Sequence, residues 1–251
     1  MKHEILAALA EVERRRAVRV LLAVESGSRA WGFASQDSDY DVRFIYVHHR
    51  DWYLRIFEER DVIEPESDGL LDPSGWELRK ALRLFSKCNL ALNEWLNSPI
   101  AYREVEGVRC QLQALIPAFF NPIAAVHHYL SMARTALDAH EVGGIISTKK
   151  LFYALRAVFA CRWIERTTSQ PPTEFQRLVD FVADDTEKSW IAELLQQKTE
   201  GFEGDRTLLT QQRLDAYTSE LTGLDTYATR APRPSKASHE PLDAILRQWA
   251  I

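Results

Sequence analysis

The chain has few of the residues that build disulfide or metal–thiolate scaffolds. Three cysteines occur among its 251 residues, and they stand far apart, without a C-x-x-C pair. The odd count and the wide spacing disfavour a disulfide framework and a structural zinc site, and they predict a cytoplasmic protein. A basic segment followed by a long apolar stretch is also missing near the start, so no secretory signal is expected.

Long apolar runs and an excess of positive charge are lacking as well. The longest uninterrupted apolar runs, such as residues 20–24, have the length of a strand and are too short to cross a membrane. The net charge of −5 argues against a protein that coats a polyanion, so any contact with nucleic acid must be local. What is present, 46% hydrophobic and 27% charged residues, is typical of a globular chain with a buried core.

The first hundred residues show the pattern of a small domain of strands and helices. Short β-branched and aromatic runs bounded by Gly, Ser and Asp predict strands at 17–25 and 41–47. Two more short strands are expected at 61–64 and 69–72. Helix formers and apolar residues at helical spacing predict helices at 2–16 and 74–97.

The rest of the chain is predicted to be helical. No strand is expected beyond about residue 108, and prolines and a Gly-Gly pair separate the helical patterns. An exposed connector is expected near 229–240, before a last short helix near 241–249. We therefore predict one domain over 1–107 and a helical domain over 108–251. Before this connector, the helical domain is expected to contain helices at 122–141, 145–168, 173–183, 187–198 and 205–222.

The segment between the first two predicted strands carries the residues with chemistry. Gly27 and Ser28 follow the first strand and can begin a short helix, whose first amides and the Ser28 hydroxyl can bind a phosphate. Asp39 and Asp41 stand two residues apart on the second strand, so their carboxylates point to the same face. Adjacent carboxylates repel each other unless a cation balances them, and hard oxygen ligands favour Mg²⁺ or Mn²⁺.

Arg43 continues the same face two residues after Asp41, where it can balance the carboxylates or hold a phosphate. A turn that binds anions, opposite a pair of carboxylates, provides the groups that metal-assisted phosphoryl transfer requires. The alternative is a polar, Asp-rich turn with solvated carboxylates. The Gly-Ser pair, ten residues before the first Asp, favours the functional interpretation.

The motif formed by Gly27-Ser28, a ten-residue gap and Asp39-x-Asp41 resembles the signature of the DNA polymerase β-like nucleotidyltransferase superfamily. The longer string Gly-Ser-Arg-Ala-Trp-Gly-Phe-Ala-Ser, followed by Asp-Ser-Asp-Tyr-Asp-Val-Arg-Phe-Ile-Tyr-Val, is similar to the RlaP-like branch, predicted nucleotidyltransferases linked to RNA repair. Later blocks within 76–96, 149–156 and 171–175 also resemble this branch, so the resemblance spans about 17–180.

The resemblance implies an α+β fold, with a polymerase-β-like core of a small mixed sheet and helices, followed by an all-helical C-terminal domain. It implies transfer of a nucleoside monophosphate from a triphosphate to a hydroxyl, and it suggests an RNA end as the acceptor. A protein or small-molecule acceptor, and a non-catalytic nucleotide- or RNA-binding module, remain as alternatives. In this comparison Asp39 and Asp41 hold the metals, and Gly27, Ser28 and Arg29 bind the β- and γ-phosphates.

The superfamily uses a third carboxylate on a neighbouring strand, and Asp68, Asp72 and Glu77 are the candidates. Asp72 ends an apolar pair that suits a strand beside that of the carboxylate pair, so we predict that Asp72 completes the metal site. An equally supported alternative makes Asp72 a helix N-cap, because Pro73 follows at a position suited to the first helical turn. Glu77 is held in reserve.

A triphosphate also requires positive charge. The helix predicted at 145–168 carries five Lys or Arg against one Glu, and Lys149, Tyr153 and Arg156 fall on one stripe opposite its core-facing leucines. The alternative is a solvated basic face, but a tyrosine between two cations favours phosphate binding with base stacking. We predict that these three residues bind nucleotide and that their stripe turns towards the Gly27–Ser28 turn.

Overall fold

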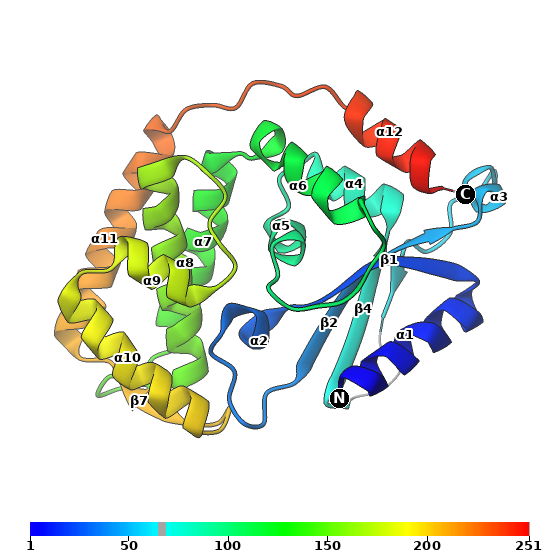
Figure 1. Ribbon diagram of the computed structural model, residues 1–251. Helices are drawn as coiled ribbons and strands as arrows, with labels where there is room; N and C mark the ends of the chain where they lie inside the picture. Colours follow the sequence, from blue (N-terminus) through cyan, green and yellow to red (C-terminus); the bar gives the residue numbers. More distant parts are fainter. Residues whose placement is uncertain (65–68, 251) are drawn as a thin grey trace. The chain divides into compact units, whose positions relative to one another are not determined.

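A computed structural model describes residues 1–64 and 69–250 and divides the chain into two compact units (Figure 1). The sheet unit combines residues 1–30, 39–119 and 235–251, and the helical unit combines 31–38 with 120–234. This division differs from the expected one at 107/108 in three ways. Residues 108–119 and the last helix group with the sheet unit, and a short segment between the two strands of the motif groups with the helical unit.

The sheet unit is built on a five-stranded mixed sheet with the strand order β3-β4-β2-β1-β5. β1 (Val18–Glu25) pairs antiparallel with β2 (Tyr40–His48), and β2 pairs parallel with β4 (Leu71–Glu77). β3 (Val62–Ile63) and β5 (Ala101–Glu104) form the two edges. Asp41 and Arg43 therefore stand on a central strand of the sheet, and the Gly27–Ser28 turn follows the neighbouring strand β1.

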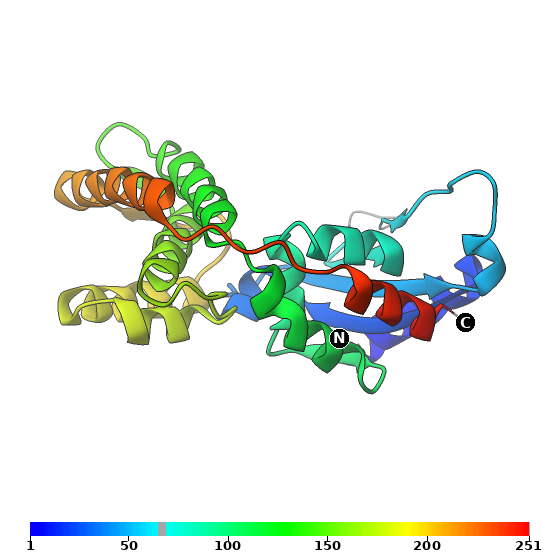
Figure 2. The same cartoon turned by 90° about the horizontal axis from the view of Figure 1, so that it is seen from above.

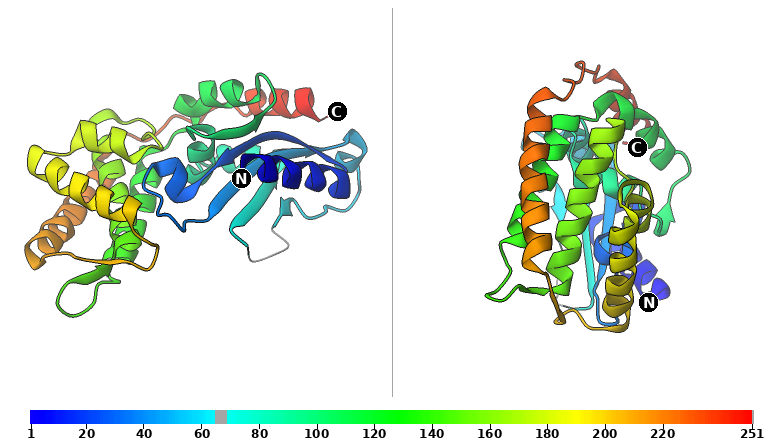
Figure 3. Two further views of the ribbon diagram at one scale, coloured as in Figure 1. Left: turned by 60° about the horizontal axis from the view of Figure 1, so that its bottom comes forward. Right: turned by 90° about the vertical axis from the view of Figure 1, so that its left-hand side faces the viewer.

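Helices pack on both faces of this sheet (Figure 3). α1 (Lys2–Arg16) buries Ile5 and Leu9 in one cluster with Val42 and Phe44 of β2. Because side chains alternate along a strand, Asp41 and Arg43 point to the opposite face. The other helices are α2 (Gly27–Trp31), which leads into the helical unit, α3 (Arg50–Tyr53), α4 (Leu78–Phe85), α5 (Leu90–Leu96), α6 (Val108–Phe119) and α12 (Glu240–Trp249).

The helical unit is centred on α8 (Thr148–Thr167), which packs beside α7 (Pro122–Leu137) and α11 (Gln211–Arg230) (Figures 2 and 3). α9 (Phe175–Val182) packs against α8, and α10 (Asp185–Glu200) follows it. Local sequence explains where these helices begin. Asn121 caps α7 ahead of a proline, and Asp184 and Glu187 form a capping box at α10.

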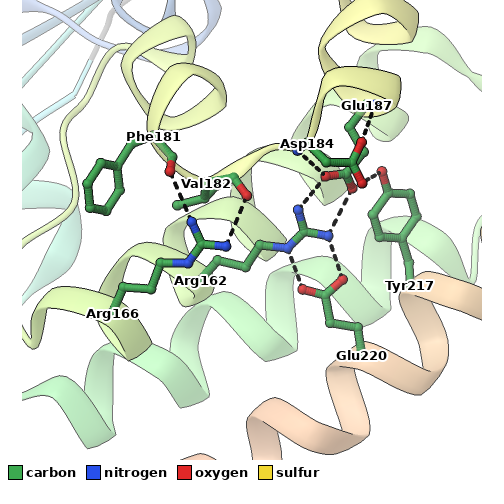
Figure 4. A network of polar contacts seen from close by, with 8 residues as sticks. All are labelled: Arg162, Arg166, Phe181, Val182, Asp184, Glu187, Tyr217 and Glu220. Atoms are coloured by element: carbon green, nitrogen blue, oxygen red, sulfur yellow. Dashed lines mark hydrogen bonds and ion pairs between the residues drawn. The ribbon is translucent and has the colours of Figure 1, made fainter.

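Arg162 of α8 links two further helices through a charged network (Figure 4). Its guanidinium donates to Glu187 of α10, at 2.6 and 2.9 Å, and to Glu220 of α11, at 2.5 and 2.7 Å. Tyr217 donates its hydroxyl to Glu187 at 3.2 Å. The two carboxylates balance the partly buried cation and satisfy its planar donors, which is the arrangement that makes a charge shielded from solvent tolerable.

The mixed α+β class is confirmed, and each segment expected to be helical contains a helix. The helix expected at 74–97 is instead two helices, α4 and α5, the one expected at 205–222 is α11, and α6 lies outside the expected helical patterns. Two expectations about strands are also wrong. Residues 74–77 continue β4 instead of beginning a helix. The second half does contain strands, since β6 (Ile145–Ser147) pairs with β7 (Arg206–Leu208). Strands of three residues are too short to show a periodic pattern. In the described part of the chain, no helix combines the length and the apolar character needed to cross a membrane.

Candidate active site

The first motif element is a turn at the end of β1 that lies directly against Asp41. The Ser26 amide donates to the Asp41 carbonyl oxygen at 2.8 Å. Gly27 then opens α2 with a φ of 60°, and a Cβ on it would lie 2.2 Å from Asp41 Oδ2. Only glycine combines this backbone conformation with such a close approach. The Gly-Ser turn therefore lies directly against the strand that carries Asp41.

Asp41 and Asp72 are neighbours on the parallel strands β2 and β4, where they stand directly opposite each other. Arg43 joins them, because its Nη2 donates to Asp41 Oδ1 at 2.9 Å and to Asp72 Oδ2 at 2.7 Å. Its Nη1 also donates to the Asp72 carbonyl oxygen at 2.7 Å. All three side chains keep some exposure, 32% for Asp41, 35% for Asp72 and 20% for Arg43, so a ligand can reach them.

The candidates for the third carboxylate are separated by this geometry. Asp72 lies on β4, so the alternative that it caps a helix is wrong. Glu77 is the actual cap of α4, and it pairs in register with Tyr46, five residues along β4 from Asp72. Glu77 is buried and accepts a hydrogen bond from the Tyr53 hydroxyl at 2.5 Å. Its position therefore rules it out as the third carboxylate beside Asp41. Asp68 lies outside the described residues.

Asp39 precedes β2 and is exposed, and its backbone is fixed by Arg29. Arg29 Nε donates to the Asp39 carbonyl oxygen at 3.0 Å, while its guanidinium lies 3.8 Å from the centre of the Tyr40 ring. Ser28, in contrast, is only 6% exposed within α2. Arg29 therefore stands between the turn and the first carboxylate, and Ser28 offers its hydroxyl from a buried position.

Glu25 is a carboxylate of the site that the sequence analysis missed. It is fully buried at the end of β1, where Oε1 accepts from the Asp41 amide at 2.8 Å and Oε2 accepts from the Tyr102 hydroxyl. Burial raises the pKa of Glu25, and the nearby Asp41 charge adds to the rise. The signal in the sequence is a single acidic residue directly after the apolar run 20–24, two positions before Gly27.

The donor set fits a divalent cation only in part. Asp39 and Asp41 offer hard carboxylate oxygens, and the missing Cβ of Gly27 lets Asp41 Oδ2 lie close to the turn. Among the residues that the structure describes, however, no three His, Cys, Asp or Glu side chains gather at a distance that could hold a metal ion. Arg43 instead supplies the positive charge between Asp41 and Asp72.

The three residues of the basic stripe expected on α8 differ in their exposure to solvent. Lys149 is partly exposed and forms an ion pair with Glu203, and Tyr153 is half-buried with its ring edge-on to Trp31, 4.9 Å between centroids. Arg156 is only 1% exposed, and its guanidinium lies 4.4 Å from the Trp31 ring centre. The expectation that all three form one accessible stripe is therefore wrong for Arg156. The Gly27–Ser28 turn and Asp41 belong to the sheet unit, whereas Lys149, Tyr153 and Arg156 belong to the helical unit.

The segment 31–38 is held by the helical unit through buried polar contacts. Lys198 of α10 is 1% exposed and donates to the Ser35 hydroxyl. Ser38 donates to Glu203 Oε1 at 2.8 Å and accepts from the Ser35 amide at 2.9 Å. The Glu203 amide in turn donates to Asp37 Oδ1 at 2.8 Å. Residues far away in the sequence thus fix the residue that directly precedes Asp39.

Comparison with known proteins decides the family. The model of the RNA repair pathway DNA polymerase beta family, RlaP, matches residues 1–248. The chain belongs to the RlaP family. The uncharacterized protein YcgL of Bacillus subtilis (strain 168) is 48% identical over 206 residues, which cover 82% of this chain and 79% of that protein. The family's name places the chain among DNA polymerase β-like proteins, a nucleotidyltransferase type of enzyme, and associates it with RNA repair.

The RlaP match covers both compact units, so the helical unit is part of the family's architecture. Segment 31–38 also ties the helical unit to the motif, because it lies between Ser28 and Asp39 in the sequence and is packed into the helical unit. Phe33 is fully buried there between the rings of Phe152 and Phe175, at centroid distances of 5.0 and 5.6 Å. Sequence reasoning could not detect Lys198 and Glu203, because their partners stand more than 160 positions away.

We expect Lys198 to make the free energy of unfolding of this RlaP protein increase as the pH rises above neutral. Burial lowers the pKa of Lys198 below its ordinary value of 10.5. Between the lowered pKa and 10.5 the unfolded chain binds more protons than the folded chain, so the free energy of unfolding increases with pH. Lys198→Met should remove this increase. Urea unfolding between pH 8 and about 10.5 measures it, with Lys188→Met of the same helix as the control. Equal pH dependence in both variants would contradict the assignment.

Proposed function

We propose that the protein is a divalent-cation-dependent nucleotidyltransferase that moves a nucleoside monophosphate from a triphosphate to a hydroxyl, with an RNA end as the acceptor. The observation that carries the proposal is the contact of the Gly27 turn with Asp41, together with the register that sets Asp72 beside Asp41. Family membership supports the class of reaction, and the association with RNA repair supports the acceptor.

Carboxylate oxygens are the donors that Mg²⁺ or Mn²⁺ prefers, and Asp39 and Asp41 would hold the cation. When bound, the cation would favour loss of the acceptor hydroxyl's proton and balance charge on the transferred phosphate. Asp72 would be the third ligand only if the Arg43 guanidinium moves from Asp72 Oδ2, which it now contacts at 2.7 Å. Arg43 would then be available for a phosphate oxygen, which a guanidinium binds well.

The residues of the turn would bind and orient the triphosphate. The amides that begin at Gly27, the Ser28 hydroxyl and the Arg29 guanidinium supply donors beside the carboxylates, and phosphate oxygens accept from such groups. Glu25 would have a positioning role. It accepts from the Asp41 amide and from Tyr102, so it fixes the backbone of the carboxylate strand and leaves the Asp41 side chain directed at the turn.

Transfer of label from an α-phosphate-labelled triphosphate tests the proposal. The protein is incubated with Mg²⁺ or Mn²⁺ and, in separate reactions, with single-stranded RNA that carries a free 3′-hydroxyl, with a protein mixture and with a small-molecule extract. Label on RNA with release of pyrophosphate is the expected result. Label on protein or on a small molecule would show that the acceptor is not RNA. No transfer to any of the three would overturn the proposed activity.

We expect Asp72→Asn to weaken Mn²⁺ binding by about tenfold, since a neutral amide replaces a charged ligand while the Arg43 contact can be kept. Electron paramagnetic resonance of free Mn²⁺ measures this without turnover. Glu77→Gln is the matched control, because Glu77 stands on the same strand but caps α4. Unchanged Mn²⁺ affinity in Asp72→Asn would limit Asp72 to holding Arg43.

A further inference from the structure

The helical unit contains a pocket of about 550 Å³ between α7 and the first turns of α8. The residues that line it all belong to this unit, so the pocket is complete within one compact body. Those from α7 recur at spacings of three and four residues and therefore lie on one helix face. The side chains with chemistry are His128, Met132 and Thr135 from α7, and Lys149, Lys150 and Tyr153 from α8.

The charged part of this lining is cationic. Lys149 and Lys150 stand in the first turn of α8, and no carboxylate is among the residues that line the pocket. Cations at this end oppose the positive end of the helix macrodipole, and the turn has no acidic residue to compensate. Glu203 forms an ion pair with Lys149, and the exposed Lys150 adds a second positive charge. A bound anion would offset this placement.

The other walls are aromatic and apolar. Tyr153 is held in one orientation, because its ring lies edge-on to Trp31, and the Arg156 guanidinium in turn lies over the Trp31 ring. Met132 and Ala136 contribute apolar surface from α7. A fixed tyrosine face beside a flexible thioether suits a flat aromatic ring. Thr135 and His128 add side chains that can form hydrogen bonds at the edge of such a ring.

We infer that this pocket binds a nucleoside phosphate, with the phosphate at Lys149 and Lys150 and the base against Tyr153 and Met132. Its volume lies within the range of small-molecule sites, about 300–1,000 Å³. Inorganic phosphate alone would make no use of the aromatic wall, and an apolar ligand would make no use of the lysines. A free nucleotide and the terminal nucleotide of single-stranded RNA share the required chemistry. The inference rests on the pocket and is independent of the proposed transfer reaction.

Titration calorimetry without Mg²⁺ tests the inference with adenosine 5′-monophosphate, a single-stranded RNA hexamer and inorganic phosphate as separate probes. Lys150→Glu and Thr135→Glu each place a carboxylate at the pocket, and each should weaken nucleotide binding about tenfold. Lys236→Glu reverses a charge in the exposed connector and should leave the affinity within about twofold. Inorganic phosphate should bind more weakly than the nucleotide. Tighter, more salt-dependent binding of the hexamer would identify the RNA end as the source.

A photoreactive 8-azido nucleotide supplies a second readout, since its crosslinks should map to peptides that contain Tyr153 or Met132. Equal affinity in the Lys150→Glu, Thr135→Glu and Lys236→Glu proteins, each with an unchanged unfolding midpoint, would overturn the inference. So would crosslinks confined to the peptide of the Gly27 turn. Transfer activity in a protein with such results would reject the pocket alone, whereas pocket binding without transfer would reject the proposed function alone.

Discussion

Asp39→Asn and Asp41→Asn are each expected to lower nucleotide transfer by about a thousandfold. Each amide would remove a charged ligand, and a bound cation contributes several kcal/mol to stabilising the transferred phosphate, at a factor of ten per 1.36 kcal/mol. The label-transfer reaction with the preferred acceptor measures the loss. For Asp41 the expectation also follows from its position against the Gly27 turn.

The folded state should survive these changes. Without a metal, each substitution removes repulsion between neighbouring carboxylates, and Arg43 keeps Asp72 as a partner when Asp41 is neutral. The free energy of unfolding should therefore change by less than about 1 kcal/mol. Asp37→Asn is the matched control in the same segment, because its amide oxygen can still accept from the Glu203 amide. Wild-type turnover in the double Asp39→Asn, Asp41→Asn protein would refute the proposed function.

The part of the site that could be predicted from sequence is the part fixed by short-range geometry. Asp39 and Asp41 follow from strand periodicity, and the turn at Gly27 follows from a backbone conformation that glycine adopts easily. Asp72 has two local interpretations, because an Asp-Pro pair suits a helix start as well as a strand. Strand pairing decided it, and pairing across 31 positions of chain is a tertiary property that local patterns do not contain.

The contributions of the helical unit could not be predicted for the same reason. Arg156 falls on a helical stripe with Lys149, and periodicity alone predicts that both lie on one accessible face. The structure buries Arg156 because Trp31, far away in the sequence, offers its ring to the guanidinium. Lys198 is buried because Ser35 accepts its hydrogen bond. In each case the partner comes from segment 31–38, whose packing into the helical unit no local pattern revealed.

The second large effect is expected from Gly27→Ala, which adds a single carbon to the site. The new Cβ would lie 2.2 Å from Asp41 Oδ2, so the carboxylate or the turn must shift. Gly27 also has a φ of 60°, and a left-handed conformation costs a residue with a Cβ about 1–2 kcal/mol. We expect transfer to fall at least about a hundredfold, since a misplacement of about 1 Å in an active site can cost this much.

Gly32→Ala separates the two causes, because Gly32 has a φ of 89° but, beyond its chain neighbours, no atom lies within 4 Å of the position of its Cβ. Both alanines should therefore lower the free energy of unfolding, Gly27→Ala by more because its Cβ also meets Asp41, whereas only Gly27→Ala should lower transfer and Mn²⁺ affinity. Urea unfolding, label transfer and Mn²⁺ resonance on the two proteins measure these three quantities. Equal transfer by the two variants would mean that backbone strain alone explains the glycine. A selective loss in Gly27→Ala would mean that the Asp41 carboxylate needs the space that Gly27 leaves open.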